Sequence, residues 1–539
     1  MIPFGPWHPD KAGINVAACV TAKNMLPVVN GFAPLGSLEA STGQIGSAVI
    51  VDNDGNIITD SNDYRIVSGI AASTPSTLCN GAAVVYDDDG DVFTFAGDDV
   101  GLYLLNELGE WDEISRVEVQ IHTEDNDSAL LTDSSGNIII TGASGASYQS
   151  GGGERWQFGF AGGLVIATTI NEFPQKYLLG TSENFELLGG TPPRARYIAT
   201  VRDFVVLGGL YGDERTIHWS GLANAEHWTP GAQSCDTQTF QNGGPVRGIV
   251  GGETGYIFQA DKIQRMSYAP GSPAIFNFDE VEGGRGLAAP YSLVRLGTAA
   301  YYYATDGFYT FALGAAAATP IGVGKWAKWF ADDIRPGTEQ TIIGGIDPVS
   351  KVIVWGYTTR ANPDETLDRI IIYNWALDEA VFADVEITTL AQILTQGVTL
   401  DTMDSYGTVD ELAFSLDSPV WRGGAPLLGV FGQDNAMSHF NGEAMAAEIE
   451  TNDGETQGRV LIKGVRPHIN TRSVTVAVAA READGDDVIY NADEAMADTG
   501  VNPAWASGFL ARARVTIAAG ATWSKITGIT TDHGRMGRR

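Results

Sequence analysis

A short turn built from acidic residues and glycine recurs along the chain, with apolar runs on both sides of it. Residues 51–60 read VDNDGNIITD, residues 86–95 read YDDDGDVFTF, residues 132–141 read TDSSGNIIIT, and residues 304–311 read ATDGFYTF. Asp-Gly is favoured at the tip of a two-residue hairpin because a type I′ turn needs positive φ at both central residues. The repeat therefore predicts antiparallel β-hairpins, with turns at Asp54-Gly55, Asp89-Gly90, Ser135-Gly136 and Asp306-Gly307.

The spacing of these turns indicates a repeat architecture. Gly55, Gly90 and Gly136 are separated by 35 and 46 residues. A period near 40 with a hairpin in each unit is typical of the four-stranded blades of a β-propeller. Long segments with helical periodicity and capping signals are nearly absent. We therefore predict an all-β fold with a six-bladed β-propeller. Further blades are expected at residues 204–220, 248–268, 293–312 and 351–385.

The two ends of the chain differ from this middle region. Residues 1–45 contain several prolines and little alternation, which predicts an extended N-terminal arm suited to strapping onto a neighbouring subunit. The propeller is expected to span residues 46–440, with insertions. Residues 441–539 contain alternating runs such as SVTVAVAA and ARARVTIAAGATW, which predict an added C-terminal β-sandwich-like domain with a basic tail.

Charge restricts the partners of the chain. Asp and Glu number 66 against 33 Lys and Arg, which gives a formal net charge of -33. Such a surface repels phosphate, so affinity for nucleic acid through counterion release is not expected. Double-stranded DNA could still pass beside such a wall without adhering to it.

The cysteines and the apolar runs indicate how the chain is made. Cys19, Cys79 and Cys235 are widely spaced and contain no CxxC pair, which predicts free buried thiols made in a reducing cytoplasm. The start MIPFGPWHPDK has no basic region followed by an apolar one, so no signal peptide is expected. The nearly uncharged run 297–324 is interrupted by Asp306-Gly307 and favours strands over a spanning helix. No membrane insertion is predicted.

The acidic turns are open to a second interpretation, as calcium loops. An EF-hand loop needs oxygen ligands at positions 1 and 12 when glycine stands at position 6. With Gly55 at position 6, Ile50 falls at position 1 and Ser61 at position 12; with Gly90, Val85 and Ala96 fall there. We favour hairpin corners, and calcium binding at one turn remains the alternative.

Other candidate sites have a structural interpretation as well. His218-Trp219 and His227-Trp228 are nine residues apart, which favours aromatic loop packing over a zinc site. Asp279, Glu280 and Glu282 lie near Arg285, and the favoured interpretation is an ion-paired blade edge rather than an acid–base pair. The sequence contains no GxSxG, Walker or HExxH motif. We therefore predict no catalytic residues, no metal ligands and no cofactor.

The terminal segment HGRMGRR reverses the acidic bias of the chain. It places Arg535, Arg538 and Arg539 together at the C-terminus. A solvated tail is one interpretation, and docking onto an acidic neighbouring subunit is the other.

Several segments, in order along the chain, resemble tail proteins of bacteriophages and related prophages. They are IPFGPWHPD (2–10), AKNMLPVVNGFAPLGSL (22–38), RYIATVRDFVVLGG (196–209), IHWSGLANAEHWTP (217–230), DGFYTF (306–311), RIIIYNWALDEA (369–380) and GATWSKITG (520–528). This group is allied to the packaged-DNA stabilisation proteins, the tail accessory or nozzle proteins of short-tailed phages. The resemblance covers nearly the whole chain, although none of its motifs is as specific as a metal-ligand signature.

The resemblance implies a role for the chain in the virion. It implies a structural protein made in the host cytoplasm and located in the virion tail, where a propeller with an added β-domain assembles as a hexameric ring. The ring would extend the tail tube below the portal and adaptor proteins, carry fibre or needle proteins, and conduct and close off packaged DNA. The family is structural, so it supplies no catalytic residues. A tail-displayed receptor-binding propeller and a polysaccharide-degrading tail enzyme are the alternative functions.

Overall fold

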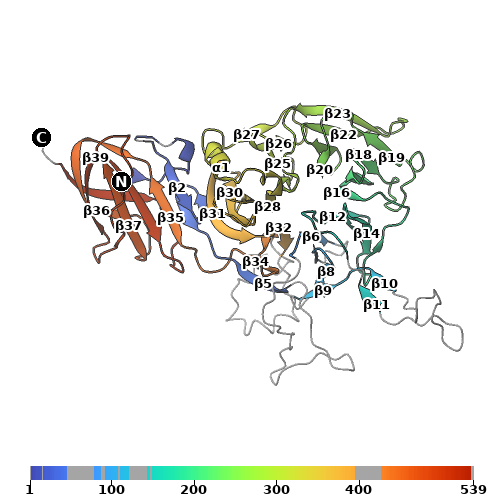
Figure 1. Ribbon diagram of the computed structural model, residues 1–539, viewed down its shortest axis with the longest axis horizontal. Coiled ribbons are helices and arrows are strands. Elements are labelled where there is room, and N and C mark those ends of the chain that lie inside the picture. The colour runs from blue at the N-terminus through green and yellow to red at the C-terminus, as the bar shows by residue number, and fades with distance from the viewer. Residues whose placement is uncertain are drawn as a thin grey trace, which may run out of the picture.

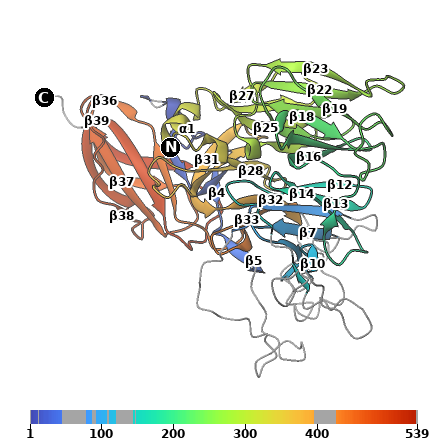
Figure 2. The same ribbon diagram turned by 45° about the vertical axis from the view of Figure 1, so that its right-hand side comes forward.

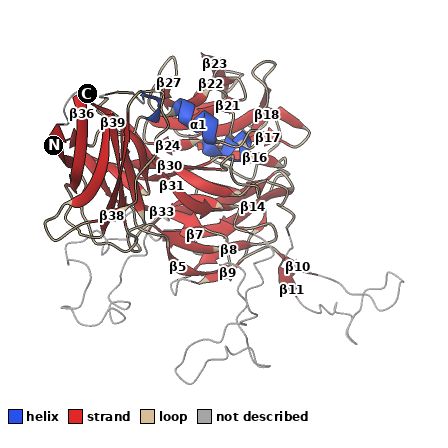
Figure 3. Cartoon of the chain, turned by 60° about the vertical axis from the view of Figure 1, so that its left-hand side comes forward, coloured by secondary structure: helices blue, strands red, loops and turns tan. Residues whose placement is uncertain are grey.

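Strands make up nearly all of the regular structure. The computed structural model describes residues 2–11, 13–14, 16–44, 78–86, 92–106, 110–119, 143–145, 148–394 and 426–535. The helical elements in these ranges are short: α1 (Ala327–Asp333) and the 3-10 helices Pro9–Lys11, Pro290–Ser292 and Glu339–Thr341. No helix in the described part of the chain has the length and apolar character needed to cross a membrane. The predicted all-β fold is confirmed (Figure 3).

Four-stranded antiparallel sheets form a ring, which confirms the predicted β-propeller (Figure 1). Within the described residues, six of these blades are self-contained sheets. They are β6–β9 (Gly81–Tyr86, Val92–Gly97, Leu102–Leu105, Trp111–Glu113); β12–β15 (Gln157–Ala161, Leu164–Thr169, Glu172–Leu178, Glu186–Leu187); β16–β19 (Ala195–Val201, Phe204–Leu210, Asp213–Trp219, Asp236–Thr239); β20–β23 (Val246–Val250, Gly255–Gln259, Lys262–Tyr268, Phe276–Gly283); β24–β27 (Val294–Leu296, Ala299–Ala304, Gly307–Ala312, Thr319–Ile321); and β32–β34 (Thr389–Leu394, Pro426–Phe431, Ala436–His439) with β5 (Glu39–Gln44).

A further four-stranded unit lies between the β24–β27 blade and the β32 blade and completes the ring. It consists of β28–β31 (Ile343–Asp347, Val352–Tyr357, Leu367–Asn374, Glu379–Ile387). This unit is not self-contained, because β31 pairs in parallel with β2 (Cys19–Lys23) through Phe382 and Lys23. The sequence predicted six blades; over the described residues the ring has six self-contained blades and this shared unit.

The shared sheet continues from the ring into the C-terminal domain (Figure 2). Its strand order is β28-β29-β30-β31-β2-β35-β39-β36-β40-β1, and β37 pairs with β38 and β39. The strands beyond the ring are β1 (Ile2–Pro3), β35 (Ala447–Thr451), β36 (Gly454–Pro467), β37 (Val474–Arg481), β38 (Glu494–Ala495), β39 (Asn502–Ile517) and β40 (Gly528–Arg535). One apolar core includes Trp355 of the ring, Trp7 of the N-terminal segment and Val515 of the C-terminal domain. The two lobes therefore share both a sheet and a core.

The N-terminal residues, expected to form an extended arm, contribute strands to sheets of their own chain. β2 lies between β31 and β35, and β5 is the fourth strand of the β32–β34 blade. β3 (Met25–Val28) and β4 (Gly31–Pro34) form a separate hairpin, and β10 (Val117–Val119) and β11 (Ala143–Gly145) pair in a two-stranded antiparallel sheet. The Asp10 carboxylate accepts the backbone N–H groups of Lys328 and Trp329, each at 2.8 Å, in the first turn of α1. The segment is thereby tied to the ring.

The hairpin predictions have different outcomes. The hairpins at Asp54-Gly55 and Ser135-Gly136 lie outside the described residues, and so does the turn at Asp89-Gly90, although its flanking strands β6 and β7 pair as expected. The expected type I′ turn at Asp306-Gly307 is wrong by one position. The ladder already pairs Ala304 with Gly307, and of the two residues only Gly307 has a positive φ, 140°. Asp306 instead accepts a hydrogen bond from the Tyr309 hydroxyl at 2.7 Å.

The three cysteines are free and buried, as predicted. Burial raises the pKa of the Cys79 thiol to about 12, and it also raises the pKa of Cys19 well above the ordinary range. A thiol with so high a pKa stays protonated near neutral pH, so these side chains serve as small apolar groups in the core.

Candidate functional site: the propeller channel and the junction core

The inner strands of the ring enclose a cavity of about 310 Å³. Its lining comes from β6, β12, β16, β20, β24, β28, β32 and the residues next to them. The ionisable side chains in that lining are Arg155, Arg295, Tyr197 and Tyr291, and no Asp, Glu or Lys is among its residues. In a chain with twice as many acids as bases, this part of the channel carries positive charge alone.

A wider cavity of about 810 Å³ forms the mouth of the channel, at the end where the inner strands begin. Arg155 lines this mouth as well as the inner cavity, so it lies at the boundary between the two. The mouth is also lined by charged residues of both signs. The acids are Asp99, Glu154, Glu214 and Glu365, and the bases are Arg196 and Arg247.

Arg196 is the arginine of the mouth that has carboxylate partners. Its Nε and Nη2 donate to Glu154 at 3.0 to 3.1 Å, and its Nη1 donates to Glu214. Burial by itself lowers the pKa of Arg196, but the hydrogen bonds to Glu154 and Glu214 outweigh it and the pKa is raised. Two of the acids at the mouth are therefore already bound to a guanidinium.

Arg155 has a different set of partners. Its Nη1 donates to the Thr389 hydroxyl at 2.9 Å, its Nη2 donates to the Thr388 carbonyl at 3.0 Å, and its guanidinium lies 5.5 Å from the centroid of the Tyr291 ring. These partners are neutral, and no ion pair joins Arg155 to a described carboxylate. Burial lowers the pKa of Arg155, and the nearby Tyr291 and Cys79 side chains oppose that effect only in part.

The other two arginines of the channel also bind neutral oxygens. Arg247 donates to the carbonyls of Leu287 and Ala288 at 3.2 and 3.0 Å. Arg295 donates to the Gly251 carbonyl at 2.9 Å. The channel thus collects guanidinium groups whose charge is not matched by an acid within hydrogen-bond distance among the described residues.

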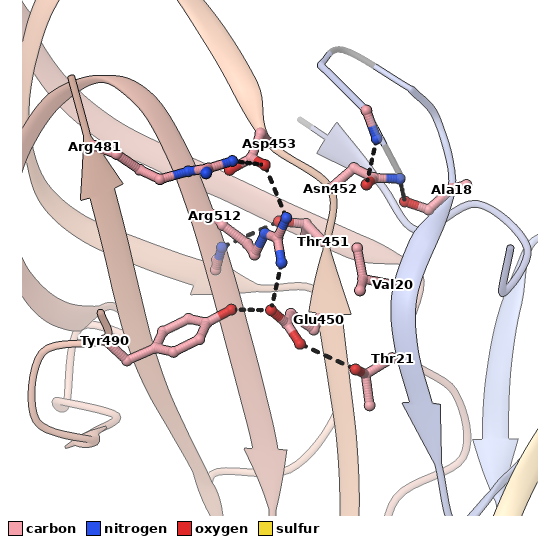
Figure 4. A network of polar contacts seen from close by, with 12 residues as sticks. Ala18, Val20, Thr21, Glu450, Thr451, Asn452, Asp453, Arg481, Tyr490 and Arg512 are labelled. Carbon is pink, nitrogen blue, oxygen red and sulfur yellow. Dashed lines mark hydrogen bonds and ion pairs between the residues drawn. The ribbon is translucent and has the colours of Figure 1, made fainter. Parts of the chain in front are cut away.

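A second group of charges lies where the N-terminal segment meets the C-terminal domain, and we call it the junction core (Figure 4). Asp453, whose side chain is 3 % exposed, accepts Arg481 Nη2 at 2.5 Å and Arg512 Nη2 at 2.8 Å. Arg512 Nη1 donates to Glu450 at 3.1 Å, and the Tyr490 hydroxyl donates to the same carboxylate. Each arginine of the junction core therefore has a carboxylate partner.

The junction core also binds the N-terminal strand β2. The Thr21 hydroxyl donates to Glu450 at 3.0 Å, and the Asn452 amide donates to the Ala18 carbonyl at 3.1 Å (Figure 4). Burial, reinforced by the negative charge of Glu450, raises the pKa of Tyr490. Burial opposes the charge of Arg512, but its bonds to Asp453 and Glu450 raise its pKa.

A third ion cluster holds β2 on its other side, against the ring. Asp384 on β31 pairs with Lys23 of β2 and accepts Arg369 Nε at 2.6 Å, and Arg369 also binds Asp333 at 2.8 to 2.9 Å. Burial raises the pKa of Asp384, but the hydrogen bonds from Lys23 and Arg369 outweigh it and the pKa is lowered.

Of the two histidine pairs singled out in the sequence, His218-Trp219 lies at the end of strand β18 and His227-Trp228 in the loop that follows. His218 is buried, its ring lies 5.3 Å from that of Trp228 in an edge-on arrangement, and its Nε2 is 3.5 Å from the Cys235 sulfur. Aromatic packing is confirmed for His218 against Trp228, but His218 and Trp219 stand on strand β18 rather than in a loop. Within the described residues no three His, Cys, Asp or Glu side chains form a group that could hold a metal. The turn acids Asp52, Asp54, Asp87 and Asp89 lie outside those residues.

The acids of β23 form the predicted ion-paired blade edge, but with other partners than expected. Asp279 pairs with Arg265 at 2.8 Å and Glu280 with Lys262 at 2.5 Å. Glu282 instead accepts the backbone N–H of Ala318 at 2.7 Å. Arg285, expected beside these acids, lies over the ring of Tyr309. The reason is the pairing of β22 with β23, which puts Arg265 directly opposite Asp279 and brings Lys262, opposite Gly283, close enough for its side chain to reach Glu280.

The sequence missed Arg155 and the junction core. Arg155 stands in the segment GGGERW, directly before an inner strand, and a charged residue at that position was the available signal. The junction core has no local signal, because Thr21 and Glu450 are separated by 429 residues. Arg535 is the last residue of β40 and pairs with Val460, whereas Arg538 and Arg539 lie outside the described residues.

No protein-family model matches the chain, and no curated protein does. Solved structures with a similar fold include the mitotic checkpoint complex (TM-score 0.36, 11 % identity, 75 % of this chain and 97 % of that one). Others are the N-terminal domain of Nup159 (0.36, 9 %, 77 % and 97 %) and the Pan2 WD40 domain of Neurospora crassa (0.34, 7 %, 68 % and 90 %).

Proposed function

We propose that the protein is a non-catalytic structural component of a bacteriophage tail. In this proposal six copies form a ring below the portal and adaptor, which conducts and closes off packaged DNA and carries fibre or needle proteins. The observation that carries the proposal is the continuous sheet from β28 to β1, which joins the ring, the N-terminal segment and the C-terminal domain. Lobes joined by backbone hydrogen bonds keep one relative orientation, which suits a subunit that holds a fixed place in a symmetric assembly.

The charge of the chain supports the same role. With a net charge of -33 on each copy, six copies would carry roughly 200 negative charges. DNA that passes such a wall is repelled by it rather than retained. A conduit has to release its cargo, so this surface suits passage better than binding.

Purified protein and purified virions test the proposal. We expect mass photometry to find six-copy particles and electron microscopy to find a central ring. In virions, labelled antibody should place the chain at the tail, below the head. A protein that stays monomeric at micromolar concentration and is missing from virions would contradict the proposal.

The cationic end of the chain is the proposed docking element between copies. Trimming residues 533–539 would also remove the ladder pairs of β40 with β36, such as Ile462 with His533. Replacement of Arg535, Arg538 and Arg539 by alanine is therefore the sharper experiment. We expect the triple variant to fold normally and to assemble less completely than the wild-type protein; unchanged assembly would refute the docking role.

A receptor-binding module displayed on the outside of a tail is the second candidate. The observation that favours it is the open channel with Arg155, Arg247 and Arg295, since a recognition site needs unmatched polar groups. Copy number and position separate the two functions. A projecting trimer at the end of the tail supports recognition, and a central ring supports the conduit.

A further inference from the structure

We propose that the propeller channel binds a small oxyanion, a carboxylate or phosphate compound, and that Arg155 is the residue that binds it. This inference goes beyond the structural role proposed above, because a wall for DNA needs no small-molecule site. It rests on the partners, the position and the surroundings of one guanidinium group.

The partners of Arg155 leave its charge available. Arg155 is half-buried, and a guanidinium that loses part of its hydration needs an acid or several hydrogen bonds to compensate it. Arg155 has the Thr389 hydroxyl and the Thr388 carbonyl, which hold one N–H of each terminal nitrogen. A guanidinium has five N–H donors. The donors that remain can bind a ligand without displacing either threonine.

The neighbouring Arg196 shows what kind of group fits such donors. At the same mouth, the two Glu154 oxygens accept Nε and Nη2 of Arg196 at 3.0 to 3.1 Å, which is the forked arrangement that guanidinium and carboxylate groups prefer. Arg155 has no such acid among the described residues. The Tyr291 ring, 5.5 Å from the guanidinium, favours one orientation of its plane. A ligand carboxylate or phosphate would take the place that Glu154 has at Arg196.

The position of Arg155 allows a ligand to reach it. It lines both the open mouth of about 810 Å³ and the inner cavity of about 310 Å³. Among the described residues, the inner cavity is lined by Arg155 and Arg295 and by no acidic side chain, so an anion is attracted more strongly once it has passed the acids of the mouth. The dimensions favour a small molecule over a polymer.

The acidic surface selects against large anions. A polyanion such as DNA would meet the net charge of -33 along its whole length. At physiological salt the repulsion from the acidic surface decays over a Debye length of about 8 Å. A small anion therefore crosses only this short distance before it reaches the channel. The same chain can therefore repel nucleic acid and bind a compact oxyanion.

Titration calorimetry on the purified full-length protein tests the inference. The probes are inorganic phosphate and malonate, each titrated at constant ionic strength with chloride as the balancing anion. We expect saturable binding of at least one probe to the wild-type protein. If neither probe shows saturable binding at concentrations up to about 10 mM, the proposal is overturned.

Substitutions assign the binding to Arg155. Arg155→Gln removes the charge, and we expect it to weaken the affinity by about tenfold or more, since charge-assisted hydrogen bonds are lost. Arg155→Lys keeps the charge but not the fork, so we expect phosphate to retain more of its affinity than malonate does. Arg472→Gln, on the exposed pair with Asp498, is the matched control and should bind like the wild type. Binding to Arg155→Gln at wild-type affinity would contradict the assignment. Should that variant fail to fold, equal losses for both probes in Arg155→Lys would contradict it.

Discussion

The arginines of the channel and those of the junction core differ in the groups that they bind. Arg481 and Arg512 share the buried carboxylate of Asp453. Arg155 binds a hydroxyl and a carbonyl, and Arg247 binds two carbonyls. The junction core uses opposite charges to fix three segments of the chain in one place. In the channel, Arg155, Arg247 and Arg295 have no carboxylate partner among the described residues, whereas Arg196 is paired with Glu154 and Glu214.

This difference predicts opposite responses to mutation. Removing one partner of a buried ion pair leaves the other charge without compensation, and that costs more than the pair itself contributes. Removing a charge that has no acidic partner also removes its desolvation cost. Substitution of a channel arginine should therefore change the stability of the protein little, whereas substitution in the junction core should lower it strongly.

The largest effect is expected at Asp453. Asp453→Ala leaves Arg481 and Arg512 without their common carboxylate, and we expect the free energy of unfolding to fall by about 3–5 kcal/mol. Urea denaturation followed by tryptophan fluorescence measures this loss. Asp498→Asn, on the exposed pair with Arg472, is the control and should leave the denaturation midpoint unchanged. Equal midpoints for both variants would break the comparison.

A smaller loss is expected at Glu450. Glu450→Gln keeps the shape of the side chain and removes the charge that Arg512 and the hydroxyls of Tyr490 and Thr21 bind. We expect a loss of about 1.5–3 kcal/mol, the range for hydrogen bonds to charged groups. The same denaturation experiment measures it. A variant as stable as the wild type would show that Asp453 alone holds the junction core together.

Acid should weaken the third cluster. The pKa of Asp384 is lower in the folded protein than in the unfolded chain, so the unfolded chain binds more protons as pH falls. The stability that Asp384 contributes is fully present above the ordinary aspartate pKa of about 3.9 and is lost as pH falls through the lower folded pKa. We expect the stability difference between the wild type and Asp384→Asn to shrink over that window. A difference that does not change with pH would contradict this role.

The smallest effect is expected in the channel. Arg155→Gln gives up two hydrogen bonds to neutral oxygens and also removes a charge with no described acidic partner. We expect the free energy of unfolding to change by no more than about 1 kcal/mol. Thermal and urea denaturation measure it. A loss as large as that of Asp453→Ala would mean that Arg155 is structural, and it would make the channel and the junction core alike.

The ring could be predicted from the sequence because the hairpin pattern that indicates it is local and is repeated along the chain. A strand, a glycine turn and a returning strand lie within about a dozen residues, and strands β25 and β26 are placed correctly even though their turn is displaced by one residue. The blade expected at residues 351–385 corresponds to β29–β31, but the sequence did not show that β31 pairs with β2 rather than ending the sheet. The N-terminal strands resemble an arm because their partners, β34 and β35, lie near the other end of the chain.

For the candidate site, too, only contacts between residues near one another in the sequence could be predicted. The blade-edge acids of β23 could be predicted to be ion-paired, because their bases stand on the preceding strand. The junction core could not, since residues 21, 450, 481, 490 and 512 meet through the packing of distant strands. Arg155 could be seen in the sequence, but its lack of a carboxylate partner is a property of three dimensions.

The pairing of β5 with β34 sets an order of events during synthesis. Gln44 pairs with Ala436, roughly 390 residues later, so the ribosome must deliver almost the whole polypeptide before the last blade can form. At about 5–20 residues per second this wait lasts from tens of seconds to more than a minute. During that time β5 has no partner strand, and a free strand edge invites pairing with other nascent chains. A message that is cut short before codon 436 would therefore yield a product that is prone to aggregate rather than a smaller working ring.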